Sequence, residues 1–544
     1  MSSTTASEAG APSATGAAGR SLSATGAAAI AGVVATGAAL ATSELLGAMF
    51  PGATSLVSAV GQVVVDLQPP GAKDFVVSLF GTNDKLALEI LIVIVAVVIG
   101  AGLGILARRS FMLAALGFAA FGGVGFIASL GDPVAIGESN AVVAAVSVGV
   151  ALLVLNWLLS WATPRPEPLR RGARYRVGGG APEPASMPDW SRRAFIVRAG
   201  AVGVGAVGAG FLGRALLDQQ HSTPVGSGPP IPPATDTVPP PPPEADLSST
   251  IPGLTPIVMP NDKFYRIDTA LLVPVVDTAG WTLRIHGLVD RETTLTWEQL
   301  IALPMFEQYV TLACVSNEVG DKLVGNAKWT GVRLRQVLEI AGVQPAATQL
   351  VGRSVDGFTV GMPTSWVMDP AREPMIALEM NDAPLPRNHG YPARLIVPGL
   401  YGYVSATKWL KELELTTLEA FDAYWVPLGW AKEAPILTQS RIDTPRGDVK
   451  AGATVPIAGV AWAPDRGISK VEVSIDGVWQ DARLSKPISD ATWVQWVVPW
   501  TTTAGTHTLQ VRATDGTGAV QDEGPTPPPP DGARGWHTVR VNAG

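Results

Sequence analysis

Long apolar stretches, separated by short polar connections, dominate the first part of the chain. The second stretch contains the run ILIVIVAVVIGAGLGIL, and the fourth ends in NWLLSWA. Each approaches the roughly 20 residues that a helix needs to cross a bilayer. The pattern predicts a membrane domain, residues 26–217, with about five transmembrane helices at 26–50, 86–107, 111–130, 141–162 and 199–217. The first stretch is mostly Ala, Gly and Val, which contribute little transfer free energy, so a buried soluble helix is its alternative.

Positive charge between these stretches predicts their orientation. Arg20 precedes the first stretch, Arg108 and Arg109 lie between the second and third, and seven arginines fall within 165–193. The connection 131–140 carries two acids and no Lys or Arg. Because cytoplasmic connections are enriched in Lys and Arg, the N-terminus is expected in the cytoplasm. Five crossings then place the rest of the chain outside.

The fifth stretch follows a second signal, the hexapeptide SRRAFI at 191–196. Two arginines before a mild, Gly/Ala-rich apolar stretch resemble the twin-arginine export signal, which serves proteins exported in the folded state. Ordinary positive charge beside a membrane helix is the alternative.

Two segments outside the apolar stretches have biased composition. Residues 1–25 are rich in Ala, Ser, Gly and Thr, which predicts a disordered tail. Residues 218–250 are rich in proline, with five consecutive prolines at 239–243. That composition favours extended polyproline II structure, so we predict a semi-rigid linker that holds the next region away from the bilayer.

Residues 251–438 show short elements of mixed type. WTLRIHGLV at 281–289 alternates like a strand, and Thr296 with Gln299 has the spacing of a capping box that opens a short helix at 295–303. WTGVRL at 329–334 leads into a helix that runs through about Ala341. We predict an α+β domain with a mostly β scaffold.

From residue 439 to 544 the pattern is one of strands only. The strands VPIAGVAW, SKVEVSIDG, WVQWVVPW and THTLQVRATD are separated by turn residues at the spacing of an immunoglobulin-like β-sandwich. The Pro-rich segment 524–534 is predicted to be a loop insertion before a last strand, WHTVRVN.

Composition excludes several classes of function and cofactor. Charged residues make up 16% of the 544 residues, below the roughly 25% of ordinary soluble domains, which supports membrane segments. A net charge of -7 gives no support for nucleic-acid binding. The single cysteine, Cys314, excludes an internal disulfide and an iron–sulfur cluster held by several cysteines. No histidine lies in the apolar stretches and no Cys-x-x-Cys-His occurs, so no haem is expected.

Cys314 is the first candidate for chemistry. A single cysteine is often a small buried hydrophobe, but an idle thiol outside the cytoplasm would oxidise. Two roles fit a retained thiol, namely a soft ligand to a metal or a nucleophile with a histidine base. His389 is a candidate base.

Several motifs together resemble the molybdopterin domain of the sulfite oxidase family, over residues 261–417. These are FYRID at 264–268, TLACVSN at 311–317, WTGVRL at 329–334, and NDAPLPRNHGYPARLIVPGLYG at 381–402, which runs on into SATKWL at 405–410. The last is the most specific, with a His-Gly-x-Pro-x-Arg run followed by Pro-Gly and Lys-Trp-Leu. The family also carries an immunoglobulin-like domain next in the chain.

The resemblance implies roles for individual residues. Cys314 matches the thiolate ligand to molybdenum, and Arg266 and Tyr401 lie near the reacting centre, with Trp430 beside the pocket. The residues that hold the anionic pterin cofactor are then Cys314, Asn317, His389, Arg394, Lys408, Phe264, Tyr265 and Arg266. A structural salt bridge to Asp262 or Asp268 is the alternative for Arg266.

The chain departs from the family after Asn317. Sulfite oxidases have arginines there that bind the anionic substrate, whereas this chain has Glu318 and Val319. A carboxylate would repel sulfite, so sulfite is disfavoured and a sulfoxide or another small oxo compound is favoured.

We therefore expect a molybdenum-cofactor oxidoreductase, anchored in a bacterial cell membrane and acting by oxo transfer outside the cytoplasm. Its electrons would come from a separate partner, such as a cytochrome or a quinol-linked membrane protein. A non-catalytic cell-envelope protein that retains the fold, and a Cys/His hydrolase, are the alternatives.

Overall fold

The computed structural model describes residues 23–50, 52–67, 84–131, 135–162, 189–222, 228–271 and 273–544. The predicted tail and most of the arginine-rich connection lie outside these residues. The chain divides into two compact units, of which the first comprises residues 1–60, 88–129 and 137–214, and the second 61–87, 130–136 and 215–544.

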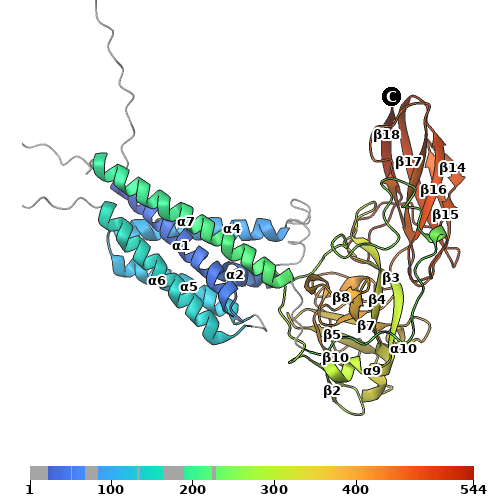
Figure 1. Cartoon of the computed structure of the whole chain (residues 1–544), viewed down its shortest axis with the longest axis horizontal. Coiled ribbons are helices and arrows are strands. Elements are labelled where there is room, and N and C mark those ends of the chain that lie inside the picture. The colour runs from blue at the N-terminus through green and yellow to red at the C-terminus, as the bar shows by residue number, and fades with distance from the viewer. Residues whose placement is uncertain are drawn as a thin grey trace, which may run out of the picture. The chain divides into compact units, whose positions relative to one another are not determined.

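The first unit is helical (Figure 1). Its helices are α1 (Ala24–Met49), α2 (Leu56–Asp66), α4 (Asp84–Ala107), α5 (Phe111–Ser129), α6 (Gly137–Ala162) and α7 (Asp189–Ser222), although α2, α4 and α7 extend past its limits. Within the described residues, five helices are long and apolar enough to cross a membrane, which agrees with the predicted number. The short helix α2 is not among the predicted elements.

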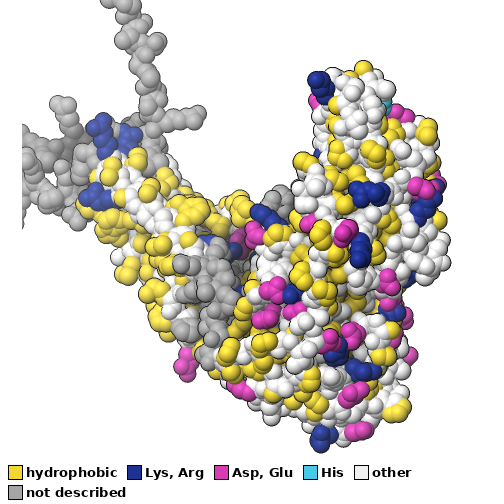
Figure 2. All heavy atoms as spheres, turned by 45° about the vertical axis from the view of Figure 1, so that its right-hand side comes forward, with side chains coloured by type: hydrophobic (Ala, Val, Ile, Leu, Met, Phe, Trp, Pro, Cys, Tyr) yellow, Lys and Arg dark blue, Asp and Glu magenta, His cyan; other side chains and the backbone are white. Residues whose placement is uncertain are grey.

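Apolar side chains cover the outside of this helical unit (Figure 2). Val98 is 66% exposed, Leu153 is 72% exposed and Val204 is 75% exposed. Monomeric soluble proteins rarely expose contiguous apolar patches of more than a few hundred Å². The surface therefore suits a lipid environment.

Helices α1 and α4 approach closely because glycines face each other. A Cβ built on Gly104 would lie 2.1 Å from the carbonyl oxygen of Ala28, and one on Gly32 would lie 2.0 Å from that of Gly100. Small residues at such positions let membrane helices gain van der Waals contact that larger side chains prevent.

The second unit begins with two β-sheets. One has the strand order β2-β1-β10-β5-β6, with β1 and β10 parallel, and the other has the order β3-β4-β7-β8, with β9 paired to β7. Their bounds are β1 Thr282–Gly287, β2 Thr293–Thr296, β3 Met305–Ala313, β4 Val324–Arg333, β5 Gln349–Ser354, β6 Thr359–Pro363, β7 Met375–Met380, β8 Ala383–Pro384, β9 Arg394–Ile396 and β10 Leu410–Thr416.

Short helices connect these strands, as the sequence predicts. The predicted capping box is present in α8 (Trp297–Ile301), where the Thr296 side chain accepts from the Gln299 backbone and the Gln299 side chain accepts in return. Helix α9 (Leu334–Ala341) follows β4 directly. Two further helices, α10 (Thr364–Met368) and α11 (Gly402–Ser405), are single turns.

The C-terminal part is a two-sheet sandwich. The sheets have the orders β11-β12-β16-β15 and β14-β13-β17-β18. The strands are β11 Gln439–Thr444, β12 Thr454–Trp462, β13 Ile468–Ile475, β14 Val478–Asp481, β15 Arg483–Leu484, β16 Val494–Thr501, β17 Gly505–Asp515 and β18 His537–Ala543. Alternating side chains such as Val471, Trp496 and Leu509 form the core between the sheets. The loop between β17 and β18 contains the Pro-rich segment.

The Pro-rich linker differs from the spacer that the sequence predicts. From Gly228 onward it packs onto the second unit, since the Thr235 N–H donates to the Met305 carbonyl oxygen at 3.0 Å and the Glu307 N–H donates to that of Asp236 at 2.9 Å. Leu247, Ile251 and Leu254 are buried in one cluster with side chains of the sandwich. The linker covers the open edge of β3, where unpaired backbone groups are available, and its apolar residues gain burial.

The glycine contact between α1 and α4 gives a direct test. Gly104→Leu should destabilise the helical unit by roughly 1–3 kcal/mol, because the added side chain meets backbone that cannot yield. Gly102→Leu is the matched control, since nothing lies within 4 Å of a Cβ there. Thermal unfolding in detergent should show a lower midpoint for Gly104→Leu alone, and equal midpoints would contradict the close contact.

Candidate functional site

Cys314 stands at the end of β3 and faces a cavity. The cavity has a volume of about 390 Å³, within the size range of small-molecule pockets. The Cys314 N–H donates to the Leu323 carbonyl oxygen at 2.9 Å, and the Asn317 N–H donates to that of Cys314 at 3.1 Å. The Asn317 side chain accepts from the Leu323 N–H at 2.7 Å. Asn317 therefore closes the cysteine loop, residues 314–323, and does not line the cavity.

Residues of the sandwich contact this loop. Gly320 has φ +87°, and a Cβ built there would lie 2.2 Å from Cδ2 of His537 on β18. The Arg441 guanidinium donates to the Asp321 carbonyl oxygen at 2.7 Å. His537 accepts from the Ile442 N–H at 2.9 Å through Nδ1, and burial lowers its pKa to about 4. The ring that touches the loop is therefore neutral at pH 7.

His389 lies in the 3₁₀ turn Arg387–His389 and is buried. Its Nε2 lies 3.1 Å from the carbonyl oxygen of Asn261, so Nε2 carries the proton. Burial, with the nearby cations Lys408 and Arg394, lowers the pKa of His389 to about 3. Nδ1 has no hydrogen-bond partner. The neutral ring therefore offers an unused acceptor.

Arg394, on β9, is 5% exposed. One guanidinium nitrogen donates to the His389 carbonyl oxygen at 3.2 Å, whereas Nε has no partner. Burial lowers its pKa to about 10, so Arg394 stays charged at pH 7. A buried donor without an acceptor costs roughly 1–3 kcal/mol, and a bound anion would remove that cost.

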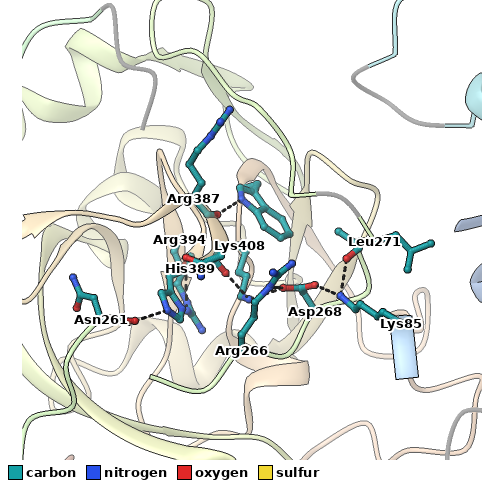
Figure 3. Close-up of polar contacts among 12 residues, drawn as sticks. Lys85, Asn261, Arg266, Asp268, Leu271, Arg387, His389, Arg394 and Lys408 are labelled. Carbon is teal, nitrogen blue, oxygen red and sulfur yellow. Dashed lines mark hydrogen bonds and ion pairs between the residues drawn. The ribbon is translucent and has the colours of Figure 1, made fainter. Parts of the chain in front are cut away.

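Lys408 donates to the carbonyl oxygen of Asn388 at 2.9 Å and pairs with Asp268 at 3.0 Å. Burial lowers the pKa of Lys408 to about 8, with Arg394 and Arg266 adding to the effect. Burial by itself would raise the pKa of Asp268, but Lys408, Lys85 and Arg266 hold it well below its usual range. Figure 3 shows these cations around one carboxylate, which leaves net positive charge.

Some of the other predicted site residues line the cavity and some do not. Tyr265 and Trp430 line the cavity with Cys314, Arg394 and Lys408. Burial raises the pKa of Tyr265. Phe264 lies behind the cavity, with its ring centroid 5.7 Å from that of His389. His389 and Phe264 do not themselves line the cavity.

Two predicted positions differ from their expected roles. Arg266 pairs with Asp268 at 2.9 Å and is not among the cavity-lining residues, as the salt-bridge alternative has it. Tyr401 is buried, and its hydroxyl lies 3.5 Å from the Leu437 nitrogen. Tyr403 lines the cavity instead, with its hydroxyl donating to the Ala431 carbonyl oxygen at 2.5 Å. Tyr401 precedes the helical turn α11 and Tyr403 lies within it, so the turn directs the two tyrosine side chains differently. The residue type alone does not reveal this difference.

Sequence reasoning also misses Arg387. Its side chain is 1% exposed, and Nε, Nη1 and Nη2 have no hydrogen-bond partner. The Arg387 side chain extends away from the group formed by His389, Arg394 and Lys408 (Figure 3). Its place two residues before His389, in the most specific motif, is the signal that could have found it.

The residues around the cavity fit an anionic metal-carrying cofactor. Arg394 lines the cavity and has an unpartnered Nε, and the buried residues His389 and Thr407 near it have an unpartnered acceptor and an unpartnered hydroxyl, beside net positive charge. Within the described part of the chain no group of three or more His, Cys, Asp or Glu side chains could hold a metal ion. Cys314 is one donor, so a metal bound there would bring its other ligands with it, as a metal–dithiolene group does.

Comparison with known proteins agrees with this geometry. Residues 270–425 match the oxidoreductase molybdopterin binding domain, and residues 440–511 match a bacterial Ig domain. The chain carries an oxidoreductase domain of the sulfite oxidase family. We call residues 270–425 the molybdopterin domain.

Among known relatives, mitochondrial sulfite oxidase of Drosophila melanogaster is 31% identical, over 40% of this chain and 40% of its own length. That of Homo sapiens is 29% identical, over 52% of this chain and 61% of its own. The chain thus spans about half the length of these relatives. The crystal structure of the sulfane dehydrogenase SoxCD from Paracoccus pantotrophus is similar, with TM-score 0.46 and 24% identity over 54% of this chain and 84% of that one.

The packing of Gly320 on His537 predicts how the sandwich controls the cysteine loop. In protein made without cofactor, Gly320→Ala should change the iodoacetamide alkylation rate of Cys314 several-fold, because the methyl group meets the His537 ring. Gly357→Ala is the control, since Gly357 has a similar φ of +88° and nothing within 4 Å. Adding His537→Ala to Gly320→Ala should restore the rate. An unchanged rate in Gly320→Ala would show that the sandwich does not position the loop.

Proposed function

We propose that this chain is a membrane-anchored molybdenum-cofactor oxidoreductase that acts by oxo transfer on a small substrate outside the cytoplasm of a bacterial cell. The observation that carries the proposal is the combination of Cys314, facing the cavity, with the buried and incompletely partnered groups of His389 and Arg394. A thiolate is a soft ligand, and the unpartnered Nε of the buried Arg394 favours a bound anion.

The protein residues divide the work of holding the cofactor. When bound, the cofactor supplies a molybdenum centre that moves an oxo group with two electrons. Cys314 would ligate the metal, and the neutral His389 would accept a hydrogen bond through Nδ1. Arg394 and Lys408 would bind the anionic part by charge-assisted hydrogen bonds. A nearby anion favours the protonated form of Lys408, so binding would raise its pKa from about 8.

The electron partner is proposed to be a separate protein, either a cytochrome or a quinol-linked membrane protein. No histidine lies between residues 1 and 220, and Cys314 is the single cysteine of the chain. These facts support delivery of electrons from outside this polypeptide.

The substrate is proposed to be a sulfoxide or another small oxo compound, with sulfite disfavoured. Glu318 belongs to the cysteine loop and lines the cavity. Its charge repels a small anion at the place where the family binds sulfite.

Replacing Cys314 tests the proposal. Protein purified from a cofactor-competent host should contain molybdenum and a pterin. Cys314→Ala should lose turnover by more than the roughly 10- to 100-fold that outer-shell residues typically cause. It should still retain pterin, because His389, Arg394 and Lys408 are unchanged. Absence of molybdenum from the wild-type protein, or full turnover by Cys314→Ala, would contradict the proposal.

The proposed location has its own test. The two arginines Arg192 and Arg193 begin the apolar span Arg192–Leu217 of α7. Arg192→Lys with Arg193→Lys preserves the positive charge, so a purely electrostatic role would be unaffected. If the twin-arginine pathway is used, the molybdopterin domain of this variant should become inaccessible to protease added outside the cell. Arg108→Lys with Arg109→Lys is the control, and normal export of both variants would exclude the pathway.

A further inference from the structure

Part of the cavity lining is a cluster of aromatic side chains, which we call the aromatic end. Tyr403, Trp425 and Trp430 form it, and the Tyr403 and Trp430 ring centroids lie 5.8 Å apart while those of Trp425 and Trp430 lie 6.5 Å apart. Tyr403 comes from α11, and the two tryptophans come from the segment after β10. Since such rings carry a negative face, they favour apolar groups and cations.

The sandwich contributes the adjoining wall through its Pro-rich loop. Pro527, Pro528 and Pro529 line the cavity, although they belong to the loop between β17 and β18. Prolines have no N–H to donate, so this wall offers an oxoanion no backbone donor.

Contacts within the loop and with neighbouring segments hold it in place. The Ala431 N–H donates to the Pro530 carbonyl oxygen at 2.9 Å, and the Gly532 N–H donates to that of Pro528 at 2.7 Å. A Cβ on Gly532 would lie 2.6 Å from the Tyr401 hydroxyl oxygen. The buried Tyr401 therefore packs directly against the loop at Gly532.

The charge of the lining also opposes an anion. Among the described residues that line the cavity, Arg394 and Lys408 are the cations, and both belong to the cofactor-holding group. Asp268, Glu318 and Asp356 line it as well. Asp268 is paired with Lys408 and Arg266, and burial raises the pKa of Asp356. Glu318 is the exposed carboxylate among these three, and its charge opposes the binding of an anion.

We infer that the aromatic end, defined by Tyr403, Trp425 and Trp430 with Pro527–Pro529, determines specificity and binds the organic substituent of a cationic or dipolar oxo compound. Glu318 attracts the positive centre of the substrate, and the aromatic rings pack on the alkyl or aryl groups of the substrate. Inorganic oxoanions are excluded from the cavity, because they have neither a positive centre nor an organic group. This inference rests on the proposed function, because it names the substrate class of the same site, and it makes the sandwich part of the substrate pocket.

Two probes of the same ring and opposite charge test it, benzyltrimethylammonium and benzylsulfonate. Isothermal titration of the purified holoprotein in detergent should show clearly tighter binding of the ammonium probe. Trp425→Leu should weaken that binding by about 3- to 30-fold, the range of cation–π contributions, whereas Trp425→Phe should keep most of it. Glu318→Gln should reduce the preference for the cation, and Pro528→Gly should weaken the benzyl probe more than tetramethylammonium.

Trp479→Leu is the matched control. Trp479 packs edge-on against Trp536 in the sandwich, with ring centroids 5.0 Å apart, and it does not line the cavity. This variant should bind the ammonium probe like the wild type. Equal or tighter binding of benzylsulfonate by the wild type overturns the inference, and so does a folded Trp425→Leu that loses no affinity.

Molybdenum content and turnover, measured on the same samples, separate this inference from the proposed function. Protein that contains molybdenum and turns over sulfite while preferring benzylsulfonate overturns the inference and leaves oxo transfer standing. Protein without molybdenum that still binds the ammonium probe through Trp425 supports the inference and removes the proposed function.

Discussion

Desolvated positive charge around Asp268 is the constraint on which the site depends. Lys408 and Arg394 are nearly inaccessible to solvent, His389 beside them is uncharged, and one carboxylate balances several cations. An unpaired buried charge is costly, and the unused donors and acceptor of Arg394 and His389 add to that cost. A bound anion with both acceptors and donors relieves all of these at once. The fold thus forms a site that favours an anionic group with donors and acceptors of its own, and the molybdopterin cofactor is such a group.

The sandwich is part of this site and belongs to the same compact unit as the molybdopterin domain. It supplies the His537 ring that Gly320 packs on, the Arg441 guanidinium that binds the cysteine loop, and the prolines that line the cavity. His537 and Arg441 thus connect two segments of the sandwich to the loop that carries Cys314, and the prolines line the same cavity as Cys314. A change in the sandwich core can therefore alter the reacting centre without touching it.

The helical unit is stabilised by a different kind of packing. Its outer surface is apolar, and α1 and α4 meet through glycines, where backbone approaches backbone. In lipid, close packing of small residues substitutes for the hydrophobic effect that drives association in water. The same Ala- and Gly-rich composition that gives α1 a lower mean hydropathy than α4 gives it a surface for packing.

Local pattern was sufficient for much of the architecture. Apolar length predicted the five long helices, alternation predicted the main strands of the sandwich, and the capping box at Thr296 predicted the start of α8. These features depend on neighbours within a few residues, so the sequence expresses them directly. The short strands β14 and β15 and the helix α2 were not predicted, because elements of so few residues show no clear hydrophobic period.

The motif from 381 to 410 likewise named His389, Arg394 and Lys408 by sequence alone. Only the tertiary structure decided which side chains share the cavity: Tyr403 and not Tyr401, Arg266 with Asp268, the proline loop beside Trp425, and the linker along β3. The first two depend on local turns whose side-chain directions the residue types do not reveal. The other two depend on the closure of long loops, which brings together distant residues such as Thr235 with Met305 and Ala431 with Pro530. Local periodicity carries no record of such pairs, so they appear only when the chain is folded.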